Sequence, residues 1–229
     1  MERLKMLGAI IGDIVGSRFE WNNIKTKEFE FLNDRCFFTD DSVLTAAVGH
    51  AILVSGGNYE NLGLETVKAM RGIGRLYPGC GYGGRFNVWL FSEDPEPYNS
   101  FGNGSAMRVS PCGLAAKSLE ETKLLSRLVT EVTHNHPEGI KGAEATATSV
   151  FLARTGWEKE KIKDFVVENY YPLDFTLDSI RADYQFNEIC QDTVPQALVA
   201  FFESRDYEEA IRGAISIGGD SDTLAAIAG

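Results

Sequence analysis

Apolar residues recur at helical spacing along most of this 229-residue chain, and that periodicity constrains the fold more than any other feature. Glycine or proline stands near many ends of the periodic segments, as helix stop and start signals do. We expect helices at 4–17, 42–54, 64–76, 119–132, 137–154, 158–168, 194–203, 207–217 and 220–229. Strand signals are weak, because only residues 29–31 alternate as a short β-hairpin would. The sequence therefore predicts an all-α fold.

The chain shows no linker that would separate domains, so we predict one compact multi-helix domain over residues 1–229. Residues 77–105 are the longest stretch without a helical pattern. They combine Gly, Pro and Asn with several aromatic residues, which favours a packed binding loop. The last predicted helix has only about two turns before the sequence ends. We therefore expect that further C-terminal helices are missing from this chain.

The formal net charge of -11 argues against a general affinity for nucleic acid or anionic lipid. No apolar run approaches the roughly 20 residues that span a bilayer. Residues 1–15 lack the cleavage site of a signal peptide. The four cysteines are scattered and form no CxxC pair, which disfavours a thiolate zinc site. We expect a monomeric cytoplasmic protein with free thiols.

The first predicted helix carries a row of glycines on one face. Gly8, Gly12 and Gly16 are spaced by four residues, so their Cα atoms lie along the same side of the helix. A face without side chains allows another helix to approach closely. The sequence predicts a tightly packed, buried helix here.

Two Asp-rich clusters stand directly before apolar helices, near opposite ends of the chain. The first is residues 39–42 and the second is residues 218–223. Asp, Ser and Thr commonly cap helices, which is one interpretation of each cluster. Capping needs one side chain, however, and paired carboxylates repel each other unless a cation lies between them. Their oxygen-only donors would select Mg²⁺, Mn²⁺ or Ca²⁺ over zinc, and four carboxylates suit two ions.

Three further features could contribute to a site. Asp13 interrupts an apolar helix face, and Glu20 follows that helix. Residues 99–108 form a Gly-rich turn that could converge N–H groups on an anion or could be an ordinary loop. His134 and His136 precede a proline-started helix, where they could bind metal or substrate or simply connect two helices.

Five motifs in this order resemble the ADP-ribosylglycohydrolase family over residues 8–229. They are GDxxGxxxE at 12–20, FTDDS at 38–42, GNGSAMR at 102–108, THNHP at 133–137 and GGDSDT at 218–223. The family includes the dinitrogen-reductase-activating glycohydrolase and ADP-ribosylarginine and ADP-ribosylserine hydrolases. The resemblance implies an all-α fold with a dinuclear magnesium site, with manganese as the possible alternative.

The resemblance also implies roles for particular residues. The metal ligands would be Thr39, Asp40, Asp41, Asp220, Asp222 and Thr223. Glu20 matches a glutamate on a mobile loop of the family, and we predict Glu20, Asp41 and Asp222 as catalytic. The ADP-ribose contacts would be Ser100, Phe101, Gly102, Asn103 and His134. Asp13 receives a supporting role. Residues 79–94 contain no clear counterpart of an additional catalytic aspartate proposed in some members.

The predicted function is hydrolysis of the bond between ADP-ribose and a modified side chain or small molecule. The partner would accordingly be an ADP-ribosylated protein or small molecule, with no nucleic acid and no membrane. Two alternatives remain open at this point. The same carboxylates could serve a magnesium-dependent phosphohydrolase of nucleotide diphosphates, or the chain could bind ADP-ribose without catalysis.

Overall fold

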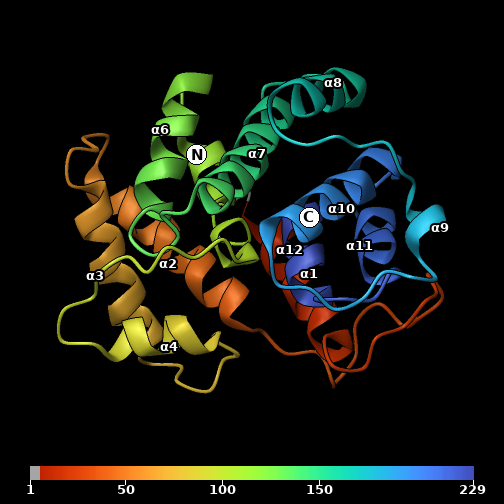
Figure 1. Cartoon of the computed structure of the whole chain (residues 1–229), viewed down its shortest axis with the longest axis horizontal. Helices are drawn as coiled ribbons and strands as arrows, with labels where there is room; N and C mark the ends of the chain where they lie inside the picture. Colours follow the sequence, from red (N-terminus) through yellow and green to blue (C-terminus); the bar gives the residue numbers. More distant parts are fainter. Residues whose placement is uncertain (1–5) are drawn as a thin grey trace.

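A computed structural model describes residues 6–229 and folds them into twelve α-helices and two short 3₁₀-helices (Figure 1). The elements are α1 (Leu7–Gly16), η1 (Ser17–Phe19), α2 (Asp40–Ser55), α3 (Leu62–Gly74), α4 (Gly84–Phe91), η2 (Asn103–Ser105), α5 (Ser110–Ala115), α6 (Leu119–Thr130), α7 (Pro137–Arg154), α8 (Lys159–Asn169), α9 (Leu177–Ile180), α10 (Cys190–Glu203), α11 (Tyr207–Ile215) and α12 (Ser221–Ala228). The β-type pairing in this range is one isolated bridge between Gly102 and Ile189. The all-α prediction is confirmed.

Each of the nine predicted helical segments contains a helix, with shifted bounds. The predicted start at residue 4 lies outside the described residues, and α1 begins at Leu7 as described. Helix α10 begins at Cys190 rather than at 194, with Pro195 inside it. Its polar first turn is held because Cys190 is buried and its N–H donates to the Phe101 carbonyl at 3.0 Å. Tertiary contacts thus extend a helix whose own first residues show little helical signal.

One expectation about irregular structure is wrong, and one weak strand signal produces no strand. Helix α4 forms inside the stretch expected to be a long loop, because Phe86, Trp89 and Leu90 bury one face against the core despite flanking glycines. Residues 29–31 form no hairpin. The Phe29 carbonyl accepts a hydrogen bond from Arg212 at 2.7 Å, and the guanidinium also lies over the Phe29 ring. An arginine on α11 therefore takes the place that a partner strand would occupy.

The hydrophobic core has two halves that share α7. One half gathers α2 to α6, and the other gathers α1 and α10 to α12. Helix α7 runs between them in Figure 1. Ala143 and Ala147 pack into the first half, whereas Ala145 packs into the second. Small residues around this helix allow both halves to approach it closely.

The predicted glycine row of α1 is confirmed as a close-packing face. Helix α1 packs more extensively against α12 than against any other described helix. A Cβ atom built on Gly12 would collide with the Ala225 carbonyl, and one on Gly16 would lie 2.5 Å from the Asp222 Cα atom. The absent side chains therefore bring the N-terminal end of α12 against the C-terminal end of α1.

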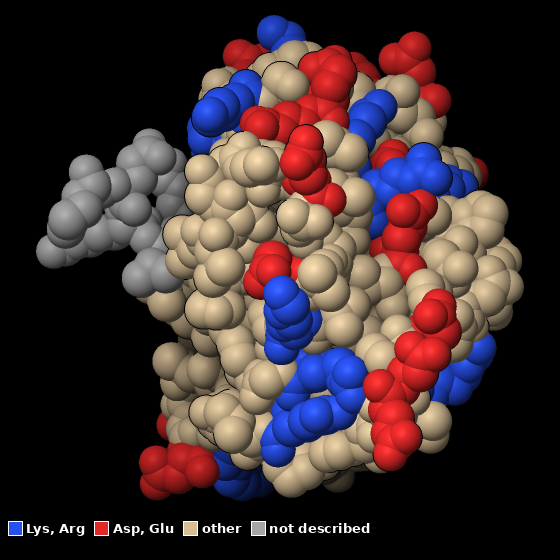
Figure 2. Space-filling model, turned by 90° about the vertical axis from the view of Figure 1, so that its left-hand side faces the viewer, with Lys and Arg blue, Asp and Glu red and all other residues tan. Residues whose placement is uncertain are grey.

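Within residues 6–229, no helix is both long enough and apolar enough to cross a membrane. Basic and acidic side chains are interspersed on the face drawn in Figure 2. On that face the basic groups do not merge into one continuous basic surface. Acidic side chains also lie inside the molecule, where the two Asp-rich clusters meet.

Candidate active site

Asp13 of α1 holds the start of α2. Its carboxylate accepts hydrogen bonds from the Thr39 N–H (3.0 Å), the Thr39 hydroxyl (2.7 Å), the Ser42 N–H (3.1 Å) and the Ser42 hydroxyl. Thr39 also occupies the N-cap position and accepts from the Asp41 N–H at 3.3 Å. The helix is thus capped without the carboxylates of Asp40 and Asp41. These two acids are free for another role, which the sequence alone could not decide.

The second cluster sits on a turn that requires glycine. Gly218 and Gly219 have φ values of 71° and 78°, which side-chain-bearing residues rarely adopt. Asn23 clasps this turn, because its amide donates to the Gly219 carbonyl (2.8 Å) and its oxygen accepts from the Gly219 N–H (2.7 Å). Asp220 follows at the N-cap of α12 but makes no capping bond. The clasp also ties the segment after Glu20 to the second cluster.

The tertiary structure brings the two clusters together. The Thr223 hydroxyl donates to Asp41 at 3.2 Å. Carboxylate oxygens of Asp13, Asp41 and Asp222 lie within 4.8 Å of one another, and the same holds for Glu20, Asp220 and Asp222. Asp222 therefore belongs to both groups of acids. Residues separated by some 180 positions in the chain form one acidic centre.

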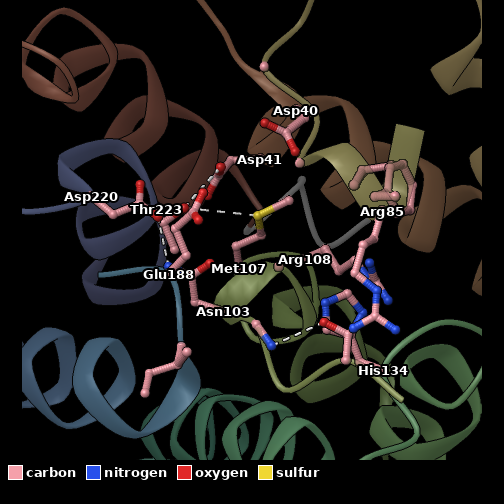
Figure 3. Close-up of a pocket in the computed structure, with 18 of the residues that line it drawn as sticks. Asp40, Asp41, Arg85, Asn103, Met107, Arg108, His134, Glu188, Asp220 and Thr223 are labelled. Atoms are coloured by element: carbon pink, nitrogen blue, oxygen red, sulfur yellow. Dashed lines mark hydrogen bonds between the residues drawn. The ribbon is translucent and has the colours of Figure 1, made fainter. Parts of the chain in front are cut away.

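This acidic centre forms one end of a cavity of about 320 Å³ (Figure 3). At this end the lining includes Glu20, Asp40, Asp41, Asp220, Asp222 and Thr223. Thr39 does not line the cavity and lies behind it, bonded to Asp13. Asp40 lines the cavity but belongs to neither tight group of acids. Of the six predicted metal ligands, five thus face the same space.

Burial and mutual repulsion disfavour the ionised state of these acids. Burial, followed by the charge of Asp222, raises the pKa of Asp41 well above its ordinary value. Burial, followed by Asp220, does the same to the pKa of Asp222. The pKa of Glu20 rises to about 7, through burial and then the charges of Asp222 and Glu188. A nearby cation would reverse this penalty.

Two oxygens in the centre are left without partners. Asp41 Oδ1 and Asp222 Oδ1 are buried and accept no hydrogen bond within the described part of the chain. Burying a carboxylate oxygen is costly unless that oxygen accepts a hydrogen bond or binds a metal ion. The donors are all carboxylate or hydroxyl oxygens, which hard divalent cations prefer. The residues present therefore fit a magnesium or manganese ion.

The opposite wall of the cavity is a loop with basic and aromatic neighbours. All five predicted ADP-ribose contacts line it: Ser100, Phe101, Gly102, Asn103 and His134. Asn103 ties the loop to two distant segments. Its backbone N–H donates to the Glu188 carbonyl (2.8 Å), and its side-chain amide donates to the Asp220 carboxylate (2.7 Å). The loop leads into the short 3₁₀-helix η2 (Asn103–Ser105) rather than into an α-helix.

The two histidines of the THNHP motif separate. His134 lines the cavity and is nearly buried. His136 lies outside it and caps α7 by accepting the Glu138 N–H at 3.1 Å. The binding interpretation therefore stays a prediction for His134, whereas His136 connects two helices.

Several cavity residues lie outside the predicted site, among them Arg85, Tyr98 and Glu188. Tyr98 lines the basic end, and the Arg85 guanidinium lies over its ring at 4.8 Å from the centroid. Glu188 lines the acidic end. Tyr98 was signalled by the aromatic residues of the long loop. Arg85 and Glu188 carry no distinguishing sequence pattern, because they reach the cavity only through the placement of α4 and of the residues just before α10.

Comparison with known proteins identifies a family and several relatives. The ADP-ribosylglycohydrolase family model matches residues 5–229. The chain is 31% identical over 142 residues to an uncharacterized protein of Archaeoglobus fulgidus, covering 55% of this chain and 47% of that protein. It is 24% identical over 264 residues to the ADP-ribosylarginine hydrolase Tri1 of Pseudomonas putida, covering 98% and 67%.

The chain is also 27% identical over 184 residues to the ADP-ribosylhydrolase ARH3 of Mus musculus, covering 66% and 48%. It thus matches about half the length of the mouse and Archaeoglobus relatives. Among solved structures, an "ADP-ribosylglycohydrolase-related protein complex" superposes with a TM-score of 0.71 at 23% identity, covering 97% of this chain and 82% of that one. This likeness shows the shared fold.

Proposed function

The chain belongs to the ADP-ribosylglycohydrolase family, and on that basis we propose that it is a metal-dependent hydrolase. Its reaction would cleave the glycosidic bond between ADP-ribose and a modified side chain or small molecule. The observation that carries the proposal is the pair of unpartnered buried oxygens, Asp41 Oδ1 and Asp222 Oδ1, at the acidic end of the cavity. The loop wall that faces them supplies the other half of an ADP-ribose site.

The metal ions are part of the proposal. Asp41, Asp220 and Asp222 would hold them, with Asp40, Thr39 and Thr223 completing the ligand set. Two Mg²⁺ ions fit the number of carboxylates, and Mn²⁺ is an alternative with the same ligand preference. When bound, such ions would orient the hydroxyl groups of a ribose and lower the pKa of a water molecule.

The chain's own residues account for the remaining steps. Glycosidic cleavage passes through an oxocarbenium-like transition state, which the surrounding carboxylates stabilise by their negative charge. Glu20 lies with Asp220 and Asp222 at the reacting end of the cavity. Without a cation its pKa is raised to about 7 by burial and by the charges of Asp222 and Glu188, and bound ions would lower that pKa, so that an ionised Glu20 could accept a proton from the attacking water. The loop of residues 100–104 would hold the diphosphate and ribose.

The proposal is tested with a panel of ADP-ribosyl-arginine peptide, ADP-ribosyl-serine peptide and a small-molecule ADP-ribose conjugate. Each is incubated with Mg²⁺, Mn²⁺ or a chelator, and the products are separated by chromatography. We expect free ADP-ribose, formed only with metal. Release of AMP or phosphate would instead identify a phosphohydrolase, and calorimetric binding without turnover would identify a binding module.

A matched pair of variants ties the activity to the acidic centre. Asp41→Asn should abolish release of ADP-ribose, because it removes one charge from the proposed ligand set. Asp164→Asn on α8 is the control, since Asp164 is exposed and outside the cavity. Turnover that persists in the chelator, or in Asp41→Asn at the wild-type rate, would overturn the metal mechanism.

A further inference from the structure

A chain of three side chains runs from the core to the cavity wall. The Arg108 Nη2 atom lies 2.6 Å from the Thr133 hydroxyl, which in turn lies 2.8 Å from Nδ1 of His134. Arg108 and Thr133 are fully buried, and His134 is 5% exposed. Arg108 and His134 both line the cavity, and the group is otherwise shielded from water.

The number of available protons fixes the direction of both hydrogen bonds in this relay from Arg108 through Thr133 to His134. The pKa of Arg108, although lowered to about 10 by burial, stays above neutral pH, so its guanidinium is a charged donor with no acceptor. Thr133 must then accept from Arg108, and its own single proton remains to be donated. Within the described residues the Thr133 hydroxyl contacts one other polar partner, Nδ1 of His134. If Nδ1–H donated to Thr133 instead, the buried hydroxyl proton would have no acceptor, which is costly, so we assign Nδ1 as the acceptor and the ring proton to Nε2.

The protonated nitrogen faces the cavity wall. A Cβ atom built on Gly102 or Gly104 would lie 3.5 Å from Nε2 in either case, so this atom points at the glycine-rich loop. The Tyr98 ring packs against the imidazole, with centroids 5.8 Å apart. Burial, and then the charges of Arg108 and Arg85, lower the pKa of His134 well below its ordinary value. The imidazole is therefore neutral and presents one N–H to the cavity.

We propose that Arg108 and Thr133 are positioning residues that hold His134 as the Nε2–H tautomer, and that this N–H donates a hydrogen bond to an oxygen of bound ADP-ribose. The identity of the ligand rests on the proposed function, whereas the tautomer does not. The other tautomer would present a lone pair to the ligand and would repel an oxygen that has no proton to donate, such as a phosphate oxygen. The relay thus favours a hydrogen-bond acceptor of the ligand at the position opposite Nε2.

The tautomer can be measured without any substrate. In a long-range ¹H–¹⁵N correlation spectrum of uniformly ¹⁵N-labelled protein, His134 should show a pyridine-type Nδ1 and a pyrrole-type Nε2. The spectrum contains three histidines, and His50→Gln and His136→Gln variants assign the remaining signals to His134. A pyrrole-type Nδ1, or a doubly protonated ring near neutral pH, would overturn the relay.

Two variants of Thr133 separate positioning from packing. Thr133→Val keeps the shape but removes the hydroxyl, and should produce a mixture of tautomers and weaken ADP-ribose binding roughly tenfold. Thr133→Ser keeps the hydroxyl and should restore both the single tautomer and the affinity. A Thr133→Val protein that keeps one Nε2–H tautomer and wild-type affinity would refute the positioning role.

Calorimetry with ADP-ribose distinguishes this inference from the proposed function. Wild-type protein that shows the Nε2–H tautomer and does not bind ADP-ribose would overturn the assigned ligand and the proposed function together, while the tautomer assignment would be supported. Wild-type protein that binds and hydrolyses its substrate with the opposite tautomer would overturn the relay alone.

Discussion

Asp222 is the residue on which the acidic centre depends. Its carboxylate belongs to both groups of acids, and one of its oxygens has no hydrogen-bond partner in the described part of the chain. Such an arrangement is unfavourable for a protein without a cation, because the charge is buried beside other negative charges. Asp222 therefore makes folding of the metal-free protein less favourable, while it completes the ligand set for a cation.

A conservative change at this position should separate stability from activity. In chelator, Asp222→Asn should raise the unfolding temperature. The substitution removes a buried carboxyl group whose pKa is raised in the folded state and whose ionised form therefore opposes folding. With Mg²⁺ the same variant should lose more than about a hundredfold in kcat, because it removes a proposed metal ligand. Each tenfold loss corresponds to about 1.4 kcal/mol of transition-state stabilisation. Differential scanning calorimetry and an ADP-ribose release assay measure the two effects.

Asp164→Asn again serves as the control and should change neither quantity. A lower unfolding temperature for Asp222→Asn in chelator would show that the carboxylate has a structural role which the hydrogen-bond pattern does not reveal.

At the scale of elements, the geometry of the site depends on how closely α1 and α12 pack. Asp13 on α1 fixes the start of α2, and Asp222 stands in the first turn of α12. The glycine row removes the side chains that would otherwise separate these helices. The distance between the two Asp-rich clusters is thus set by residues that carry no functional group.

This dependence can be tested at Gly12. In Gly12→Ala the added methyl group would meet the Ala225 carbonyl and force α12 away, at a cost of about 1–3 kcal/mol in the free energy of unfolding. The same displacement should weaken Mg²⁺ binding, because Asp222 moves away from Asp41. Urea unfolding and calorimetric titration with Mg²⁺ measure these changes.

Gly72→Ala on α3 is the matched control. A Cβ atom on Gly72 meets nothing within 4 Å, and the residue is exposed. That variant should be stabilised by roughly 0.5–1 kcal/mol, because alanine is the better helix former, and should bind Mg²⁺ like wild type. Equal stability effects at the two glycines would contradict close packing as the reason for the row.

At the scale of the whole molecule, the chain concentrates negative charge inside a fold whose net charge is already -11. The pKa values of Asp220 and Glu20 are raised to about 6 and about 7, first of all by burial. Because each pKa is higher in the folded state than in the unfolded state, protonation of the carboxylate stabilises the folded state. Its stabilising contribution is complete below the unfolded pKa near 4 and is lost as the pH rises through 6 to 7.

The metal-free protein should therefore become less stable between about pH 5 and about pH 8. Added Mg²⁺ should raise the unfolding temperature more at the higher pH, because the carboxylates are then ionised and bind the cation without losing a proton. Thermal unfolding in buffers of matched ionic strength, with chelator or with Mg²⁺, tests both statements. A Glu20→Gln/Asp220→Asn double variant should flatten the pH dependence, whereas a metal-free protein that gains stability toward about pH 8 would contradict the assignment.

Much of the architecture was readable from local patterns. Periodicity located all nine predicted helices, and glycine spacing identified the close-packing face of α1. The helices that escaped prediction were α4, α5 and α9. Helix α4 contains glycine and asparagine and gains its stability from burying Phe86, Trp89 and Leu90, so its own propensity is a poor guide.

The site shows the same division. Motifs pointed to residues of both Asp-rich clusters and of the 100–103 loop, and the structure gathers five of the six predicted ligands and all five predicted ADP-ribose contacts around one cavity. Metal binding and catalysis stay predictions. Arg85 and Glu188 could not be found from the sequence, because ordinary charged residues become cavity residues only through the path of the folded backbone.

The sequence by itself determined the helical class, the positions that need glycine and the chemical type of the two acidic clusters. These properties depend on local spacing and on the atoms that each side chain carries. Only the tertiary structure decided that Asp13 relieves Asp40 and Asp41 of capping, that Asp222 joins both groups of acids, and that His134 rather than His136 faces the cavity. These relations join residues distant in the chain, and their distances are set by how the helices pack.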